Sequence, residues 1–273
     1  MRLRHLGRGI ERGFPVQNRR KRKKKKNMSE KKAVKEKNTK EKAAKEKNTK
    51  VKAAKETLDR QLEEKRSLAG EIIRRLELEY PDAGCTLDYN QAWKLLVSVR
   101  LAAQCTDARV NVVVQELYKK FPDVQALAQA DVDEIEEIVR PCGLGRSKAR
   151  DISACMKILW EEYGGNVPDD FELLLKLPGV GRKSANLIMG DVFGKPAIVT
   201  DTHCIRLVNR MGLVDQIKEP KKVEMELWKI IPPEKGSDFC HRLVYHGREV
   251  CTARTKPFCD RCCLADICRK IGV

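Results

Sequence analysis

Apolar residues recur three or four positions apart along most of the chain from Leu58 onward, the spacing of one face of an α-helix. The first of these faces ends before Pro81 and consists of Leu58, Leu62, Leu68, Ile72, Ile73 and Leu76. Further helices are predicted over 91–104, 108–121, 132–139, 147–163, 171–176, 183–192, 202–211, 221–230 and 238–250. Asp131, followed by Glu134, predicts a capping box at the start of one of them. Because alternating strand-like runs with hairpin signals are lacking, the fold is predicted to be all-α.

Residues 1–56 have a different pattern, in which basic side chains dominate and the repeated part has almost no apolar residue. They contain a polybasic run at 19–26 and a ten-residue near-repeat at 35–44 and 45–54. Such a segment cannot bury a core. We expect a disordered basic arm that adds salt-sensitive, sequence-independent affinity for nucleic acid; a start at Met28 would remove the polybasic run.

The net charge of +17 belongs entirely to this arm. Residues 1–56 hold 23 Lys and Arg against 6 Asp and Glu, whereas residues 57–273 hold 33 of each sign. Any affinity of the body for DNA must therefore come from local patches. Residues 181–210 form one patch, with Arg182, Lys183, Lys195, Arg206 and Arg210 against Asp191 and Asp201. This patch is either a solvated face or a phosphate-binding surface.

The sequence contains no run long enough for a membrane span and no apolar secretory signal, so we expect an intracellular protein. Its eleven cysteines are too many for a reducing compartment if they served as disulfides. Another use for at least some of them is expected.

The most informative segment is 177–186, Leu-Pro-Gly-Val-Gly-Arg-Lys-Ser-Ala-Asn. Pro178, Gly179 and Gly181 interrupt one helix and permit the tight turn that starts the next, which leaves backbone N–H groups available to an anion. Lys183 falls in the first turn of the new helix, where the positive end of the dipole favours the neutral amine. A neutral lysine can attack an aldehyde carbon. The alternatives are an ordinary corner between helices and a hairpin that only grips a nucleic-acid backbone.

Eighteen residues beyond this lysine, Asp201 precedes the predicted helix at Thr202. By itself, an aspartate at this position is expected to be an N-cap. Its spacing from Lys183 adds a catalytic interpretation, and one carboxylate can serve both purposes.

Five thiols lie within eighteen residues near the C-terminus: Cys251, Cys259, Cys262, Cys263 and Cys268. Structural zinc sites usually have two Cys-x-x-Cys pairs, whereas this run has one such pair between two outlying cysteines. The pattern favours an iron–sulfur cluster on Cys251, Cys259, Cys262 and Cys268, with Cys263 left over. The other six cysteines, Cys85, Cys105, Cys142, Cys155, Cys204 and Cys240, are expected to be small buried hydrophobic residues.

Together these motifs resemble the endonuclease III family: the hairpin at 177–183, Asp-Thr-His at 201–203 and the cysteine loop at 251–268. Residues 101–107 and 143–149 look like two of the family's DNA-facing segments. The resemblance implies a bifunctional DNA glycosylase and apurinic/apyrimidinic lyase with a [4Fe-4S] cluster. Such an enzyme would act as a monomer on double-stranded DNA that contains an oxidised pyrimidine or an abasic site.

The resemblance also implies a two-lobed helix-hairpin-helix glycosylase fold. A six-helix barrel would span 85–195, and the iron–sulfur cluster lobe would combine 57–84 with 196–273. The basic arm at 1–56 lies outside the resemblance.

Roles of individual residues follow from the same resemblance. Lys183 would be the nucleophile and Asp201 would stabilise positive charge on the sugar. Gln104, Leu144 and His203 would fill the gap left by the flipped nucleotide and contact the opposite strand.

Further DNA contacts are implied at the turn and in the cysteine loop. Gly179 and Gly181 would hold a backbone phosphate beside Arg182, and Arg254 with Lys256 would add phosphate contacts. The family usually has six residues between its first two cluster cysteines, whereas this chain has seven, and Thr200 stands where valine is usual.

Two other functions stay open at this point. The related adenine-removing mismatch glycosylase shares the fold and cluster but lacks the lysine found here at Lys183. A non-catalytic helix-hairpin-helix protein would use the turn and the cluster for docking alone. For the host compartment, a bacterial cytoplasm or nucleoid is favoured over a nucleus, although the polybasic run would serve either.

Overall fold

The computed structural model describes residues 47–48 and 51–273. The chain divides into two compact units, Met1–Arg60 and Gln61–Val273. In the described part of the first unit, residues 51–60 are helical and their side chains are exposed. Most of the predicted basic arm, including its polybasic run, lies outside the described residues.

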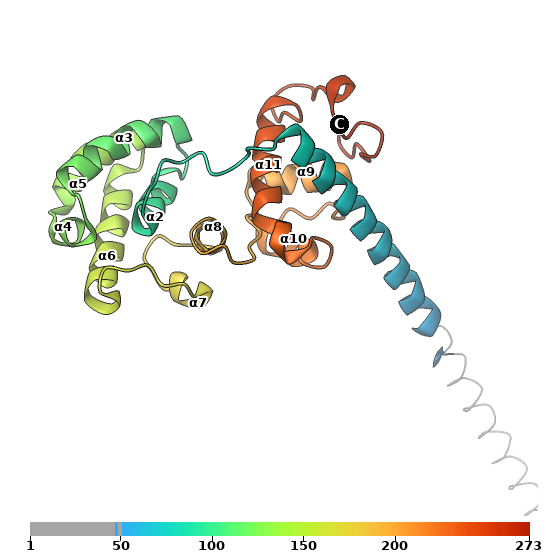
Figure 1. The fold of residues 1–273 in the computed structure, drawn as a ribbon, viewed down its shortest axis with the longest axis horizontal. Helices are drawn as coiled ribbons and strands as arrows, with labels where there is room; N and C mark the ends of the chain where they lie inside the picture. Colours follow the sequence, from blue (N-terminus) through green and yellow to red (C-terminus); the bar gives the residue numbers. More distant parts are fainter. Residues whose placement is uncertain (1–46, 49–50) are drawn as a thin grey trace, which may run out of the picture. The chain divides into compact units, whose positions relative to one another are not determined.

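The second unit is built from helices joined by short connections (Figure 1). Residues 61–79 form its first helical segment. The α-helices that follow are α2 (Ala92–Leu101), α3 (Asp107–Lys120), α4 (Val124–Gln129), α5 (Val132–Val139), α6 (Gly145–Tyr163), α7 (Phe171–Leu174), α8 (Arg182–Asp191), α9 (Thr202–Met211), α10 (Pro220–Leu227) and α11 (Gly236–Glu249). Three short 3-10 helices accompany them: η1 (Arg140–Cys142), η2 (Pro233–Lys235) and η3 (Cys259–Arg261). The described residues include no strand, which confirms the predicted all-α class. In this part of the chain, no helix combines the length and apolar character that crossing a membrane requires.

Helix positions agree with the apolar pattern, and the differences have local causes. Both α5 and α9 have their predicted bounds. The predicted helix at 91–104 was too long, because the chain leaves α2 after Leu101 and Gln104 adopts a left-handed backbone. Helix α4 was missed, since six residues are too few to display a helical period; the Asp123 side chain caps it by accepting from the Ala126 N–H.

The predicted capping box of α5 is present only as a cap. Asp131 is the N-cap, but its side chain accepts from the Asp133 N–H. Glu134 instead forms an ion pair with Lys120, with 3.3 Å between Nζ and Oε1. Asp131 therefore caps the start of α5 without the second hydrogen bond that Glu134 would add in a capping box.

Buried apolar side chains of the second unit form two clusters. The first draws its buried residues from Leu87 to Ala197, and α6 packs against α2, α4 and α5 within it. The second combines buried residues of 69–80 with others between Ile198 and Leu264, and includes α9 packed on α11. Leu187 on α8 packs against both clusters. The lobe boundaries expected from the sequence remain a prediction beside these two observed clusters.

Four polar contacts connect helices of the first cluster with helices of the second. Arg182 at the start of α8 pairs with Glu224 of α10 at 2.6 Å between Nη2 and Oε1. Asp107 at the start of α3 pairs with Arg248 of α11 at 2.7 Å between Oδ2 and Nη2. Asp191 at the end of α8 accepts from Ser237, at 3.1 Å, and lies 2.8 Å from His241 Nε2, both on α11. These contacts set how α8 meets α10 and α11.

The second cluster makes a testable contribution to stability through Leu243, which is fully buried on α11. Leu243→Ala should lower the free energy of unfolding by about 3 kcal/mol, because the lost methyl groups leave a cavity. The matched change Leu78→Ala, at a side chain 72 % exposed, should alter it by less than about 0.5 kcal/mol. Denaturant titration measures both, and equal losses at the two positions would contradict the assigned core.

Candidate active site

A cavity of about 410 Å³ lies where α8 and α9 begin, beside α11 and the end of α2. Lys183 and Asp201 both line it, so the chain brings together the two residues that the sequence singled out. His203 lines it as well. The cavity is large enough for a small organic group such as a nucleobase with its sugar.

Lys183 is presented by the turn that precedes α8. Gly179 has φ +76°, and a Cβ there would lie 2.9 Å from Arg100 Cδ and 3.0 Å from Asp151 Cβ. Arg100 and Asp151 are themselves an ion pair, with 2.6 Å between Nη2 and Oδ2. Both the backbone angle and this close approach therefore require glycine at 179.

Gly181 is the extended N-cap of α8, with φ −101° and ψ 176°. Other residues can adopt these angles, and a Cβ at 181 would meet no atom within 4 Å. Nothing inside the protein therefore requires glycine here. The open space in front of the turn lets another molecule approach the backbone, and the helix start favours an anion in that place.

Asp201 is the N-cap of α9, and its Oδ1 accepts from the Cys204 N–H at 2.7 Å. The structural role expected for it is therefore present. The cap uses one carboxylate oxygen, and the residue also lines the cavity that Lys183 lines. Thr200, the residue that replaces the usual valine, is buried.

His203 is the second residue of α9 and lies close to α11. Its Nδ1 is 3.2 Å from Nη2 of Arg206, and a Cβ on Gly247 would come within 2.5 Å of that nitrogen. Burial lowers the pKa of His203, while Asp201 opposes the shift. A neutral imidazole is therefore favoured at the edge of the cavity.

Asp107 was not predicted as a site residue, although it also lines the cavity. Burial raises its pKa, but hydrogen bonds from Thr86 at 2.6 Å and Arg248 at 2.7 Å outweigh burial and lower it overall. A second carboxylate therefore stays ionised near Lys183. Its sequence signal, an aspartate at a helix start, is indistinguishable from that of an ordinary first-turn residue. His241 was also missed, because its partner Asp191 is distant in sequence.

Gln104 and Leu144, expected to contact DNA, share an unusual backbone. Gln104 has φ +58° and Leu144 has φ +53°; among the described non-glycine residues only Gln216 and Lys270 also have positive values. Each such residue costs roughly 1–2 kcal/mol. Leu144 is also 56 % exposed, which is unfavourable for a large aliphatic side chain. Strained backbone of this kind is commonly retained at functional sites.

The other expected DNA contacts lie in different surroundings. Arg182 donates from Nε and Nη2 to the buried Glu224 and stacks 4.9 Å from the centroid of the Phe171 ring. Arg254 and Lys256 are exposed in the loop between the first two clustered cysteines. A role for these three residues in DNA binding remains a prediction. To contact DNA, Arg182 would have to do so while paired with Glu224 or give up that ion pair.

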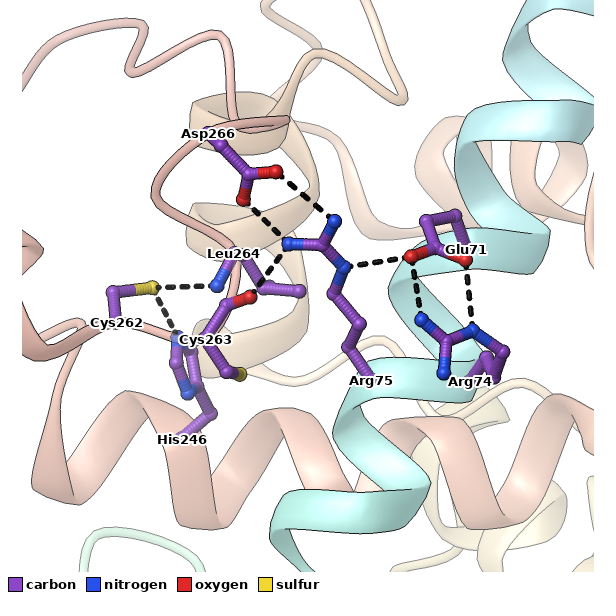
Figure 2. Close-up of polar contacts among 8 residues, drawn as sticks. All are labelled: Glu71, Arg74, Arg75, His246, Cys262, Cys263, Leu264 and Asp266. Atoms are coloured by element: carbon purple, nitrogen blue, oxygen red, sulfur yellow. Dashed lines mark hydrogen bonds and ion pairs between the residues drawn. The ribbon is translucent and has the colours of Figure 1, made fainter.

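Near the C-terminus, a second cavity is lined by four thiols: Cys251, Cys259, Cys262 and Cys268. Cys263 is not among its lining residues; instead its carbonyl accepts from Arg75 at 2.9 Å. Arg75 also donates to both carboxylate oxygens of Asp266, at 2.5 and 3.0 Å, and its Nε donates to Glu71. Figure 2 shows these contacts. The segment 61–79 thus holds the cysteine loop in place.

Hydrogen-bond donors approach three of these four sulfurs. The Arg210 guanidinium donates to Cys251 Sγ at 3.3 Å, and backbone N–H groups donate to Cys262 and Cys268, each at 3.4 Å. The buried His246 bridges Tyr80 Oη, at 3.2 Å, and Cys262 Sγ, at 3.4 Å; its contact with Cys262 is drawn in Figure 2. The hydrogen bond with Cys263 and burial raise the pKa of Cys262 to about 12, and burial raises the pKa of Cys268; the backbone donors oppose both shifts.

The six remaining cysteines are not paired in disulfides. Cys142, Cys155, Cys204 and Cys240 are buried, as expected for small hydrophobic side chains. Cys85 and Cys105 are only partly buried and line the cavity that holds Lys183. Burial raises the pKa of Cys85 to about 12, so its thiol stays protonated and unreactive.

Comparison with known proteins identifies the family. Residues 97–233 match the family described as HhH-GPD superfamily base excision DNA repair protein. Endonuclease III of Synechocystis sp. is 46 % identical over 214 residues, which cover 78 % of this chain and 96 % of that protein. Endonuclease III of Escherichia coli K12 is 38 % identical over 198 residues, 72 % of this chain and 93 % of that protein.

Solved structures agree with the sequence relatives. A trapped covalent intermediate of endonuclease III with DNA has a TM-score of 0.71 and 38 % identity, and the match covers 75 % of this chain and 96 % of that one. A non-covalent endonuclease III–DNA complex has the same TM-score and identity. These matches confirm the predicted fold class. With relatives matched over nearly their full length, and with the hairpin lysine lining a cavity together with Asp201, the chain belongs to the endonuclease III family of base excision repair DNA glycosylases.

Proposed function

We propose that this enzyme removes oxidised pyrimidines from double-stranded DNA and then cleaves the strand 3′ to the abasic site, with Lys183 as its nucleophile. The observation that carries the proposal is that Lys183 and Asp201, each at a helix start, line one cavity. A similar solved structure is a trapped covalent enzyme–DNA intermediate, which requires a nucleophilic side chain. The damaged nucleotide would leave the base stack to enter the cavity.

The reaction follows from the chemistry of an amine and a sugar. The Lys183 amine attacks C1′, the C1′–N bond to the damaged base breaks, and the base leaves with a proton. The nitrogen lone pair then expels the ring oxygen O4′, which takes a proton from solvent, and a protonated Schiff base forms between Nζ and C1′. This cation makes the C2′ proton acidic, so its loss expels the 3′ phosphate and cuts the strand. Water finally hydrolyses the Schiff base and releases Lys183.

Asp201 would stabilise the positive charge that develops on the sugar as the base departs. Its Oδ1 is held by the cap bond to Cys204, which fixes the side chain before substrate arrives. Preorganised charge of this kind needs no rearrangement during the reaction. The cap bond would therefore hold the carboxylate in place for its catalytic role.

The DNA backbone would be gripped at the turn before α8, where the open face of Gly181 admits a phosphate. Exposed Arg254 and Lys256 would add phosphate contacts. Gln104, Leu144 and His203 would occupy the space that the extruded nucleotide leaves. We expect the enzyme to bind as a monomer, in a bacterial cytoplasm or nucleoid, or in a nucleus if the host is eukaryotic.

The endonuclease III family carries a [4Fe-4S] cluster, and we propose that Cys251, Cys259, Cys262 and Cys268 hold it here. Among the described residues, no group of three or more acidic, histidine or cysteine side chains is gathered closely enough to hold a metal ion. Thiolates around one zinc ion lie about 2.3 Å from it, whereas a multi-atom cluster holds its ligands further apart. Four thiols around one cavity, with donors to three of them, fit the larger group. When bound, the cluster would cross-link the loop that bears Arg254 and Lys256.

The nucleophile can be identified by borohydride reduction on duplex DNA with an abasic site. The wild-type protein should form a covalent complex, and Lys183→Ala should form none, because no other amine would occupy its place. Lys221→Ala, at an exposed lysine of α10, is the control and should be trapped like wild type. A covalent complex of normal yield in Lys183→Ala would reassign the nucleophile.

Substituting Asp201 separates its two roles. Asp201→Asn keeps a good N-cap but removes the charge, so the free energy of unfolding should change by less than about 0.5 kcal/mol. Base excision under single-turnover conditions should nevertheless fall about 100-fold. Asp201→Ala should in addition destabilise the protein by about 1 kcal/mol. If the Asn variant excises bases at the wild-type rate, Asp201 has only the structural role of a helix cap.

Two adjacent cysteines give a matched test of the cluster ligands. Cys262→Ser should lose most of the iron and sulfide of the purified protein, because a ligand is removed. Cys263→Ser should keep both, because its thiol is not among those lining the second cavity. Iron and sulfide analysis after anaerobic purification measures the difference. Loss in both variants, or stoichiometric zinc in the wild type, would refute the assignment.

A further inference from the structure

Lys148 on α6 is fully buried, which is rare for a lysine. Its Nζ donates to three backbone carbonyls, those of Leu101, Ala103 and Cys142, each at 2.8 Å. An ammonium group has three N–H donors, so every donor is used. Lys148 is not among the residues lining the Lys183 cavity, and the mechanism above does not use it.

The three carbonyls belong to two segments that are separate in sequence. Leu101 ends α2 and Ala103 directly precedes Gln104, whereas Cys142 ends η1 and lies two residues before Leu144. The Lys148 backbone N–H also donates to the Leu144 carbonyl at 3.0 Å. Lys148 therefore connects the segment that leads to Gln104 with the segment that leads to Leu144.

Both segments need such support. Gln104 and Leu144 have left-handed backbones, which non-glycine residues keep only where their surroundings hold them. The carbonyls at the ends of α2 and η1 carry partial negative charge and have no further helical turn to donate to them. A buried ammonium satisfies them together and fixes their separation.

We propose that Lys148 is a positioning residue for nucleotide extrusion, which holds Gln104 and Leu144 in fixed register so that they can enter the duplex together. This inference rests on the proposed function. The two side chains are exposed on separate loops, so their joint insertion depends on a link between those loops. The ammonium of Lys148 is such a link. A displacement of about 1 Å in groups of this kind can lower a rate about 100-fold.

The test compares one damaged pyrimidine in two settings: paired within a duplex, and placed in a bubble of unpaired bases. Extrusion is needed for the first and largely unnecessary for the second. Lys148→Met keeps the aliphatic stem and removes the three donors. Lys157→Met, at an exposed lysine of the same helix, is the matched control. Single-turnover rates are measured where all variants are folded by circular dichroism.

Lys148→Met should excise the paired base at least about 10-fold more slowly than wild type, and the base in the bubble at nearly the wild-type rate. Lys157→Met should match wild type on both. Adding Leu144→Ala should cost less in Lys148→Met than in wild type, because the first change has already displaced Leu144.

Equal losses on both substrates, or additive effects with Leu144→Ala, would make Lys148 a purely structural residue and overturn the proposal. If Lys148→Met does not fold, Lys148→Arg, which keeps the charge but not the three-fold arrangement of donors, replaces it in the same comparison. Failure of both to fold would likewise overturn it. Absence of excision by the wild type on either substrate would instead reject the proposed function.

Discussion

The ion pair between Arg182 and Glu224 is the interaction on which the site most depends. Glu224 is nearly inaccessible to solvent, and Arg182 is the first residue of α8, directly before Lys183. A buried pair contributes little net stability, since desolvation offsets much of the attraction, but it is costly to break on one side. Its effect is therefore geometric: it holds the start of α8 against α10. Lys183, the next residue along α8, is therefore held in place relative to α10.

The chemistry around the cavity is assembled from ends of helices. Lys183 and Asp107 lie in first turns, Asp201 caps α9, and Arg248 is in the last turn of α11. Helix ends have unpaired backbone groups and partial charges, which makes them suited to binding charged groups. Asp107 balances nearby positive charge, and its bond to Arg248 also connects α3 with α11. The same polar groups thus hold the helices together and set the charge of the cavity.

The cysteine loop depends on the rest of the fold in a similar way. Arg75 fixes it from the segment 61–79, while Arg210 and His246 reach its sulfurs from α9 and α11. Arg206 links the two ends of this arrangement, since it contacts His203 at the cavity and donates to the Cys251 carbonyl at 3.1 Å. Changes in the loop therefore reach the start of α9 through a short series of contacts.

Much of this protein follows from its sequence alone, because helical periods, caps and turn residues are local properties. The all-α class, most helix positions, the turn at Gly179 and the cap at Asp201 were all predictable in this way. Lys183 and the cysteine loop also stood out by their residue patterns, and the family resemblance added the expected DNA contacts at Gln104, Leu144 and His203.

Only the tertiary structure decided the partners of these residues. It directed Arg182 to Glu224, left Cys263 outside the cavity that the other four thiols line, and added Asp107 and His241 to the cavity of Lys183. It also buried Lys148 beneath two loops that are far apart in the chain. No local pattern encodes such choices, since each depends on the distance between helices that are remote in sequence and on the cost of leaving a buried polar group unpaired.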